Sequence, residues 1–422
     1  MDTVLDDELA ELRPGKTLKT RGGARLTVGN PLGGGNEGTV FEATLDGRSV
    51  ALKVFKRDDT GRREQRTRAL ARLDLSRNVS PALAAPFDVL SWRGRTGHVA
   101  PFAPGIALQD LVDAPDFLSP RQRIVAVLKL GALMLQLHRR GLAFGDLNKG
   151  AVKLQRLGAG DVDVALVDLD SMALPGESAP LTMGTPDTSA PELRRGQQPS
   201  SVAAWQAADW TAFGHVSLEL LLAKTAGCGI EDPIAQVNAF MGVPPCLHDT
   251  AHGQAIDRAA GLPARSLPDA VRRPLARMFD PEPARRNGAA FIQALTGEFV
   301  NNHQVACTRC GLQYLVHDDL SGCPSCGHAA SHAYRAYLPN GTSVTVGSQG
   351  VALTRELLGG SPALERMHAR LFTIGGVPFV CAHGRTVLQR HRTAFLLPSG
   401  IHVPLMRGDR LGLNGVTEIF VY

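Results

Sequence analysis

Three glycines near the start of the chain have a spacing that can bind phosphate groups. Gly33, Gly35 and Gly38 follow the pattern GxGxxG, and Val40 comes two residues later. The β-branched and apolar residues around them predict a hairpin, and a glycine-rich loop of this kind can place backbone N–H groups over phosphate oxygens. Glycine-rich turns are common, so a hairpin with a purely structural role is the alternative for the glycines alone.

A lysine follows the glycines on a strand of its own. Segment 50–53 predicts a short apolar strand, and Asp46-Gly47 predicts the tight turn before it. On the period-2 pattern of a half-buried strand, Lys53 points inward. A dinucleotide-binding unit would need a helix directly after the glycines and an acidic residue about twenty residues further on. The order strand, glycines, strand and lysine argues against that interpretation.

Four cysteines later in the chain have the spacing of a metal site. Cys307 and Cys310 form one CxxC pair, Cys323 and Cys326 form a second, and twelve residues separate the pairs. Two such turns can present four thiolates in a tetrahedral shell, which is typical of a structural zinc ribbon. Because four sulfur ligands fill that shell, we expect no catalytic role for the metal and a surface position for His328. A redox-active CxxC is the alternative.

Composition and charge restrict the class of protein. The chain has 422 residues, 44% hydrophobic and 20% charged, so we expect more than one hydrophobic core. The formal net charge is only +5 and the arginines are scattered, so no nucleic-acid partner is expected.

Membrane and secretory signals are not predicted. The longest apolar run, 124–137, is interrupted by Lys129 and Gln136 and is too short for a bilayer span. Residues 1–11 are acidic and lack the apolar stretch of a secretory signal. We therefore expect a cytoplasmic protein with no membrane partner. The cysteines outside the CxxC pairs are scattered, as reduced cytosolic cysteines usually are: Cys228, Cys246 and Cys381.

Several elements must position the glycines and the lysine. Residues 61–73 predict a helix that contains one carboxylate, Glu64. Segments 87–90 and 98–102 predict two further strands, and 103–105 a hinge before a helical region. There, Ser119-Pro120 predicts the start of a long helix that ends at Gly141.

The segments after this helix resemble, in order, the motifs of protein kinases. Segment 141–148, GLAFGDLN, resembles the catalytic loop, and short strands are predicted at 152–154 and 162–167. The second strand ends in Asp168-Leu169-Asp170, which resembles the kinase DFG motif. With the glycines, Lys53 and an Ala-Pro-Glu motif at 190–192, the resemblance covers about residues 25–300.

The resemblance implies a role for each motif residue. Lys53 would hold the α and β phosphates of ATP, and Glu64 would form an ion pair with Lys53. Asp146 would be the base that accepts the proton of the attacking hydroxyl, and Asp168 would bind Mg²⁺.

The catalytic loop departs from the family pattern. Phe144-Gly145 replaces the usual His-Arg, and Ala151 replaces the usual Asn, which removes a ligand for a second magnesium. Asn148 replaces the usual Lys, and we expect it to act with the catalytic residues by helping Asp168 to hold the metal. Asp170 replaces the DFG glycine. We interpret Asp170 as a solvated strand end; the alternative is a carboxylate that compensates for Ala151.

The resemblance also implies contacts after the DFG position. Gly184-Thr185-Pro186 and Ala190-Pro191-Glu192 resemble the end of an activation segment, and Thr185 is typical of serine/threonine kinases. Glu192 would pair with Arg285 or Arg286, and the carboxylate of Asp209 would bind the backbone of the catalytic loop.

The forms FGDLN and VDLDS are most similar to bacterial serine/threonine kinases of the tellurite-resistance-associated phosphorylation triads. That resemblance implies a PP2C-type phosphatase and a von Willebrand factor A protein as partners, beside a protein substrate.

The C-terminal part, 334–422, has short β runs between Gly and Pro turns, which predicts a small β-sandwich. Gly347, His368-Ala369 and 405–409 resemble a forkhead-associated domain. Ser348 and Glu365 stand where that family has its phosphothreonine-binding arginine and serine, so we expect a protein-docking role.

The resulting prediction is an α+β protein with a bilobal protein-kinase-like fold, a zinc ribbon and a small all-β sandwich. Its expected activity is ATP-dependent phosphorylation of Ser or Thr in bacterial signalling, with Mg²⁺ or Mn²⁺. The alternative is a pseudokinase scaffold that binds nucleotide or partners without phosphoryl transfer. The predicted parts are a leader at 1–24, an N-lobe at 25–104, a C-lobe at 105–300, the ribbon at 301–333 and the sandwich at 334–422.

Overall fold

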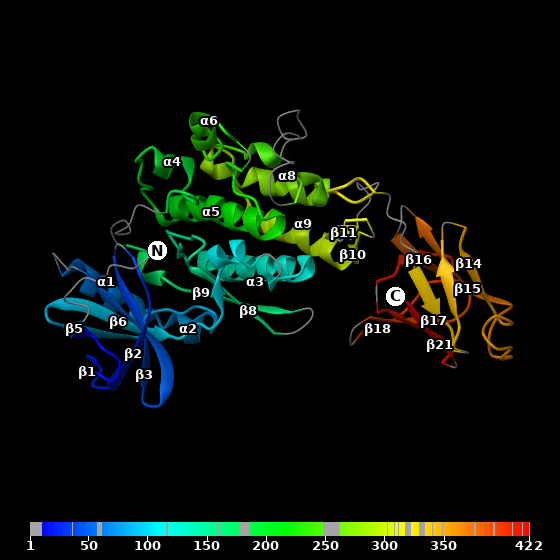
Figure 1. Ribbon diagram of the computed structural model, residues 1–422, viewed down its shortest axis with the longest axis horizontal. Coiled ribbons are helices and arrows are strands. Elements are labelled where there is room, and N and C mark those ends of the chain that lie inside the picture. The colour runs from blue at the N-terminus through cyan, green and yellow to red at the C-terminus, as the bar shows by residue number, and fades with distance from the viewer. Residues whose placement is uncertain are drawn as a thin grey trace. The chain divides into compact units, whose positions relative to one another are not determined.

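A computed structural model describes most of the chain, and its residues fall into two compact units (Figure 1). Unit 1 comprises Met1–Gly261 and Arg273–Gln293, and unit 2 comprises Leu262–Arg272 and Ala294–Tyr422. The described residues are 11–35, 37–56, 61–114, 117–157, 161–176, 185–228, 230–247, 262–301, 303–307, 309–310, 312–316, 322–328, 334–339, 341–347, 349–374, 377–390, 393–406, 408–415 and 417–421.

Unit 1 begins with a six-stranded antiparallel sheet in the order β1-β2-β3-β4-β6-β5. Its inner residues form a hydrophobic core that includes Leu26, Phe41, Leu52 and Val99. The strands are β1 (Thr17–Lys19), β2 (Arg25–Gly34), β3 (Gly38–Leu45), β4 (Arg48–Phe55), β5 (Asp88–Trp92) and β6 (Arg95–Pro101).

Tight turns fix the register of this sheet. The β3–β4 turn has Asp46 at φ 48° and Gly47 at φ 80°, the left-handed pair that suits a two-residue hairpin and was predicted there. The predicted strands at 87–90 and 98–102 are present as β5 and β6. Helix α1 (Arg62–Leu73) contacts β5 and β6, and the short α2 (Leu75–Asn78) follows it.

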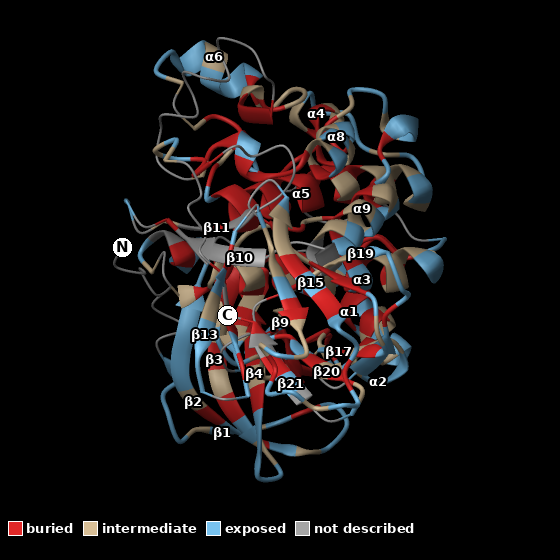
Figure 2. Cartoon of the chain, turned by 90° about the vertical axis from the view of Figure 1, so that its right-hand side faces the viewer, coloured by how far each residue is buried: buried red, intermediate tan, exposed pale blue. Residues whose placement is uncertain are grey.

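The rest of unit 1 is mainly helical, drawn from cyan to green in Figure 1. Helix α3 (Pro120–Arg139) starts at the predicted cap, where the Ser119 side chain accepts a hydrogen bond from the Gln122 N–H. The chain leaves α3 through Gly141 at φ 68°. Helix α5 (Val202–Leu222) packs on α3 and is buried along most of its length, whereas α6 (Pro233–Asn238) is largely exposed (Figure 2).

The helical part of unit 1 also contains a small three-stranded sheet. Strands β7 (Ile106–Ala107), β8 (Val152–Arg156) and β9 (Val162–Leu166) form it in that order. The remaining helices and 3₁₀ turns of the described chain are η2 (Leu108–Val112), η4 (Leu169–Ser171), α4 (Pro191–Arg194), η5 (Pro245–Leu247), η6 (Ala264–Ser266), α8 (Asp269–Arg277), η7 (Pro283–Arg285) and α9 (Gly288–Asn301).

Unit 2 contains a two-stranded ribbon and two antiparallel sheets. The ribbon pairs β10 (His303–Ala306) with β11 (Gln313–Val316). One sheet has the order β13-β12-β21-β20-β17-β18 and the other β14-β15-β16-β19. Their strands are β12 (Tyr334–Tyr337), β13 (Ser343–Val346), β14 (Val351–Thr354), β15 (Met367–Ile374), β16 (Val377–Ala382), β17 (Thr386–Arg390), β18 (Thr393–Leu396), β19 (His402–Pro404), β20 (Arg410–Leu413) and β21 (Thr417–Val421).

Residues from both of these sheets share one hydrophobic core, which includes Leu353, Leu371, Val380, Leu411 and Ile419. The chain is therefore a mixed α and β protein with an all-β C-terminal part, as predicted at that level. Among the described helices, none combines the length and apolar character needed to cross a membrane.

Candidate active site and metal centre

The ammonium group of Lys53 lies in a cluster of carboxylates. Lys53 is on β4, between Val40 of β3 and His98 of β6 in the ladder, and only 11% of its side chain is exposed. Its Nζ atom lies 3.2 Å from Asp168 Oδ1, 3.1 and 3.0 Å from the two oxygens of Asp170, and 3.8 Å from Glu37 Oε2. More than one hundred residues separate Lys53 from the two aspartates in the sequence.

Burial and neighbouring charges shift the pKa values of the residues in this cluster in different directions. Burial alone would lower the pKa of Lys53, but the nearby Asp170 and Asp168 carboxylates outweigh it and raise the pKa above the usual value. Burial raises the pKa of Glu37. Burial would also raise the pKa of Asp170, but Lys53 reverses this effect and the pKa is lowered. Burial lowers the pKa of His98 to about 4, so this ring adds no positive charge at neutral pH.

The predicted ion pair between Lys53 and Glu64 is absent. Glu64 Oε1 lies 2.6 Å from Arg21 and 2.5 Å from Arg68 on the outer side of α1. Arg66 is the inward residue: it is buried, and its Nε donates to the Asp170 carbonyl at 3.1 Å. Two residues on a helix are about 200° apart, so an inward Arg66 turns Glu64 outward.

Asp170 is not the solvated strand end that the sequence suggested. Strand β9 stops at Leu166, and the chain then enters the 3₁₀ turn η4, in which Asp170 is only 9% exposed. The turn begins at Asp168, whose φ of 57° and ψ of 41° are left-handed. That conformation costs a non-glycine residue about 1–2 kcal/mol, and it places both carboxylates against Lys53.

Asp146 lies on a loop whose polar groups are bonded to one another. Its Oδ1 accepts a 2.7 Å hydrogen bond from the Thr185 N–H. Burial raises the pKa of Asp146, although hydrogen bonds from Thr185 act in the opposite direction. The Asn148 side chain donates to the Asp146 carbonyl and accepts from the N–H groups of Gly150 and Ala151. Asn148 therefore holds the loop itself, which differs from the catalytic role predicted for it.

The predicted contact of Asp209 with this loop is present. From helix α5, its two carboxylate oxygens accept from the N–H groups of Phe144 at 2.7 Å and Gly145 at 2.9 Å. His138 Nε2 lies 2.9 Å from Asp209 Oδ2. Since Asp209 is 2% exposed, these bonds fix the backbone directly before Asp146.

Of the two arginines that could pair with Glu192, the structure selects Arg286. Its guanidinium binds both oxygens of Glu192, at 2.6 and 2.8 Å, and its side chain is fully buried. Arg285 instead pairs with Glu282 at the surface.

The glycine-rich segment is the predicted hairpin. Strand β2 extends to Gly34, Gly33 pairs with Val40, and the Gly35 N–H donates to the Gly38 carbonyl at 2.9 Å. A Cβ at Gly38 would lie 2.5 Å from the Val54 carbonyl oxygen, so this glycine permits close strand pairing. Gly33 and Gly35 have open space on the side of a missing Cβ, which leaves their backbone accessible to a ligand.

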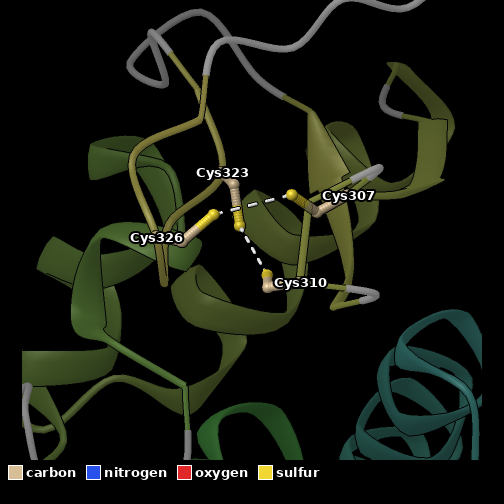
Figure 3. A group of neighbouring side chains, drawn as sticks. All are labelled: Cys307, Cys310, Cys323 and Cys326. Atoms are coloured by element: carbon tan, nitrogen blue, oxygen red, sulfur yellow. Dashed lines mark hydrogen bonds between the residues drawn. The ribbon is translucent and has the colours of Figure 1, made fainter.

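The four cysteines of the two CxxC pairs come together in unit 2 (Figure 3). Cys307 Sγ lies 3.6 Å from Cys326 Sγ, Cys310 Sγ lies 3.6 Å from Cys323 Sγ, and all four sulfurs are within 4.8 Å of one another. Zinc bound to sulfur at about 2.3 Å in a tetrahedron sets the sulfurs about 3.8 Å apart. The four thiols therefore fit a tetrahedral metal ion such as zinc.

The four-cysteine cluster is packed against strand β16 of the sandwich. Cys307, Cys323 and Tyr314 share a small hydrophobic cluster with Val377 and Phe379 of β16. The guanidinium of Arg265 donates to the carbonyl of Pro324 at 2.8 Å, within the second CxxC turn.

In the sandwich, His368 is fully buried, and both of its ring nitrogens contact backbone groups. Its Nδ1 accepts from the Glu365 N–H at 3.3 Å, and its Nε2 lies 3.1 Å from the Arg385 carbonyl. Buried Asp409 pairs with Arg390 at 2.8 and 3.0 Å. Three residues of the predicted motifs lie outside the described residues: Gly184, Ser348 and Arg407.

Sequence reasoning missed two members of the site, Glu37 and Arg66. Glu37 lies inside the glycine-rich segment, and Arg66 is one of five arginines in α1, so neither has a sequence signal that separates it from a surface residue.

In comparisons with known proteins, no family model matches the chain, and no curated protein matches it.

The Glu192–Arg286 pair predicts a large effect on stability. Glu192→Gln leaves the buried Arg286 charge without its carboxylate, so we expect a loss of about 3–5 kcal/mol in the unfolding free energy of unit 1. Glu282→Gln, which removes the exposed partner of Arg285, should cost about 0.5 kcal/mol or less. All three tryptophans are in unit 1, at 92, 205 and 210, so urea denaturation followed by tryptophan fluorescence measures this unit. Equal losses in the two variants would contradict the assignment.

The cysteine geometry predicts one zinc ion per chain. Cys323→Ser should abolish zinc binding in elemental analysis, whereas Cys381→Ser, which changes a cysteine outside the cluster, should keep it. Because the thiolates must bind metal to hold the two turns, a chelator should perturb the tyrosine signal, since all four tyrosines lie in unit 2. The tryptophan signal of unit 1 should stay unchanged. Purified protein without zinc, or equal loss in both variants, would contradict this prediction.

Proposed function

We propose that the protein is an ATP- and Mg²⁺-dependent protein kinase that phosphorylates Ser or Thr of partner proteins in bacterial signalling. The observation that supports this most directly is the contact of Lys53 with Asp168. The loop that carries Asp146 lies beside the segment of Asp168, because the Val167 N–H donates to the Ala151 carbonyl at 2.9 Å. A lysine and a metal-binding carboxylate at one point are what a triphosphate with its cation requires.

Each residue has a distinct task in this proposal. Lys53 binds the phosphates, and the exposed backbone of Gly33 and Gly35 lies along them. Asp168, whose side chain is 48% exposed, holds the divalent cation, which when bound neutralises charge on the transferred phosphoryl group. Asp146 orients the attacking hydroxyl and accepts its proton.

The rest of unit 1 supports a bilobal kinase fold. In this proposal the sheet β1–β6 with α1 is the N-lobe, and the part built on α3 and α5 is the C-lobe. Asp209 beneath the catalytic loop and the Glu192–Arg286 pair match contacts that the resemblance to kinases implies.

The narrower resemblance gives the proposed partners: a protein substrate, a PP2C-type phosphatase and a von Willebrand factor A protein. We assign docking to unit 2, as a zinc ribbon joined to a forkhead-associated-like sandwich. The shared cluster of Cys307 with Val377 supports a single rigid docking module.

A second candidate is a pseudokinase scaffold. Ala151 is fully buried and offers no side-chain oxygen, and the Asn148 amide is engaged with the loop backbone. Neither can replace the missing metal ligand. In this candidate the acidic cluster around Lys53 binds nucleotide or only stabilises the fold.

The two candidates differ in transfer of labelled γ-phosphate to the protein itself and to the proposed partners. We expect slow but detectable transfer, with Mn²⁺ supporting it better than Mg²⁺ because one strong metal ligand is missing. Asp146→Asn should abolish transfer, while Asp163→Asn, a change to an exposed carboxylate of β9, should leave it intact. The base must be ionised to accept a proton, and burial raises the pKa of Asp146. As the pH is lowered, activity should therefore be lost at a pH above the usual pKa of an aspartate.

Nucleotide binding separates failure of chemistry from failure of the site. Lys53→Met and Asp168→Asn should each weaken thermal stabilisation by ATP with metal. Wild-type protein that binds ATP but transfers no phosphate with either metal would leave the scaffold as the function. No binding at all would contradict the kinase and leave a scaffold in which the acidic cluster only stabilises the fold.

A further inference from the structure

The Lys53 ammonium is held mainly by one buried carboxylate. Both oxygens of Asp170 contact Nζ, at 3.1 and 3.0 Å, and the Asp170 side chain is 8% exposed. Asp168 offers a single contact at 3.2 Å from a half-exposed side chain, and Glu37 lies 3.8 Å away. A two-oxygen contact between buried groups fixes an ammonium more firmly than one solvated contact does.

Helix α1 supplies no carboxylate to the lysine. Glu64 is held on the outer side of the helix by Arg21 and Arg68. The inward residue of the helix is Arg66, and its Nε donates to the Asp170 carbonyl. The contacts therefore run from α1 through Arg66 to the backbone of Asp170, and from the Asp170 side chain to Lys53.

The charges of the site favour this route. If Asp168 holds a divalent cation, as proposed, its carboxylate would be directed to the metal, and another buried anion would have to keep Lys53 in place against the phosphates. Asp170 is in the same turn, is buried, and already contacts the lysine through both oxygens.

We infer that Asp170 is the positioning residue for Lys53, in place of a helix carboxylate, and that Arg66 couples α1 to it. This inference rests on the proposed function, because it assigns to Lys53 the task of binding ATP. Movement of α1 would then reach the lysine through the η4 turn instead of through a direct ion pair.

The test compares Asp170→Asn with Glu64→Gln in the full-length protein. Each change removes a charge at nearly constant volume. With Mn²⁺ saturating, Asp170→Asn should raise the KM for ATP by roughly tenfold or more, with a smaller change in kcat and none in the KM for the protein substrate. Glu64→Gln should change the KM for ATP less than about twofold, because Glu64 contacts Arg21 and Arg68 instead of Lys53.

Arg66→Lys gives a second measurement that does not depend on the folding of Asp170→Asn. It keeps a positive charge but loses the planar Nε–H donor, so the KM for ATP should rise by a smaller factor. A wild-type KM in Arg66→Lys would overturn the coupling through α1.

Three other outcomes are informative. A large effect of Glu64→Gln with a normal Asp170→Asn would overturn the inference and leave the proposed kinase activity intact. Asp170→Asn could instead raise only the Mn²⁺ concentration needed for half-maximal activity and leave the KM for ATP unchanged. That result would overturn the positioning role, because it would make Asp170 a metal ligand. Wild-type protein without ATP binding or transfer would overturn both the inference and the proposed function.

Discussion

Burial of the Lys53 ammonium is the constraint on which unit 1 depends most. Removing a charge from water costs several kcal/mol, and the interior recovers that cost only with well-placed opposite charges. Lys53 therefore needs Asp170 and Asp168 from the η4 turn and Glu37 from the hairpin. The sheet, the glycine-rich hairpin and the turn after β9 cannot separate without exposing or isolating that charge.

The same constraint explains the local strain at Asp168. A continued strand after Leu166 would direct Asp168 and Asp170 along an extended chain. The left-handed backbone at Asp168 turns the chain into η4. Arg66 then binds the backbone carbonyl of Asp170, and Lys53 binds its carboxylate. In the proposed function, Lys53 fixed by this turn would hold a phosphate, and the loop fixed by Asp209 would hold the hydroxyl beside it.

Patterns with a local physical cause could be predicted from the sequence. The Asp46-Gly47 turn, the Ser119 cap and the paired CxxC turns depend on few residues and are present as expected. The Asp209 contact followed from the kinase resemblance and is also present. The predicted ion pair of Lys53 with Glu64 was wrong. This pairing depends on the rotation of α1 about its axis, and a helix with five arginines gives little indication of which side faces inward. The role of Asp170 was wrong because a change of backbone direction at Asp168 has no sequence signal.

The most direct test of the proposed role of Lys53 is an experimental structure with a non-hydrolysable ATP analogue and Mn²⁺, in which anomalous scattering locates the metal. We predict a manganese peak at the carboxylate of Asp168, phosphate oxygens at the Lys53 ammonium, and Asp170 still in contact with Lys53. A nucleotide bound away from this cluster, or Lys53 paired with Glu64 in the complex, would contradict that role.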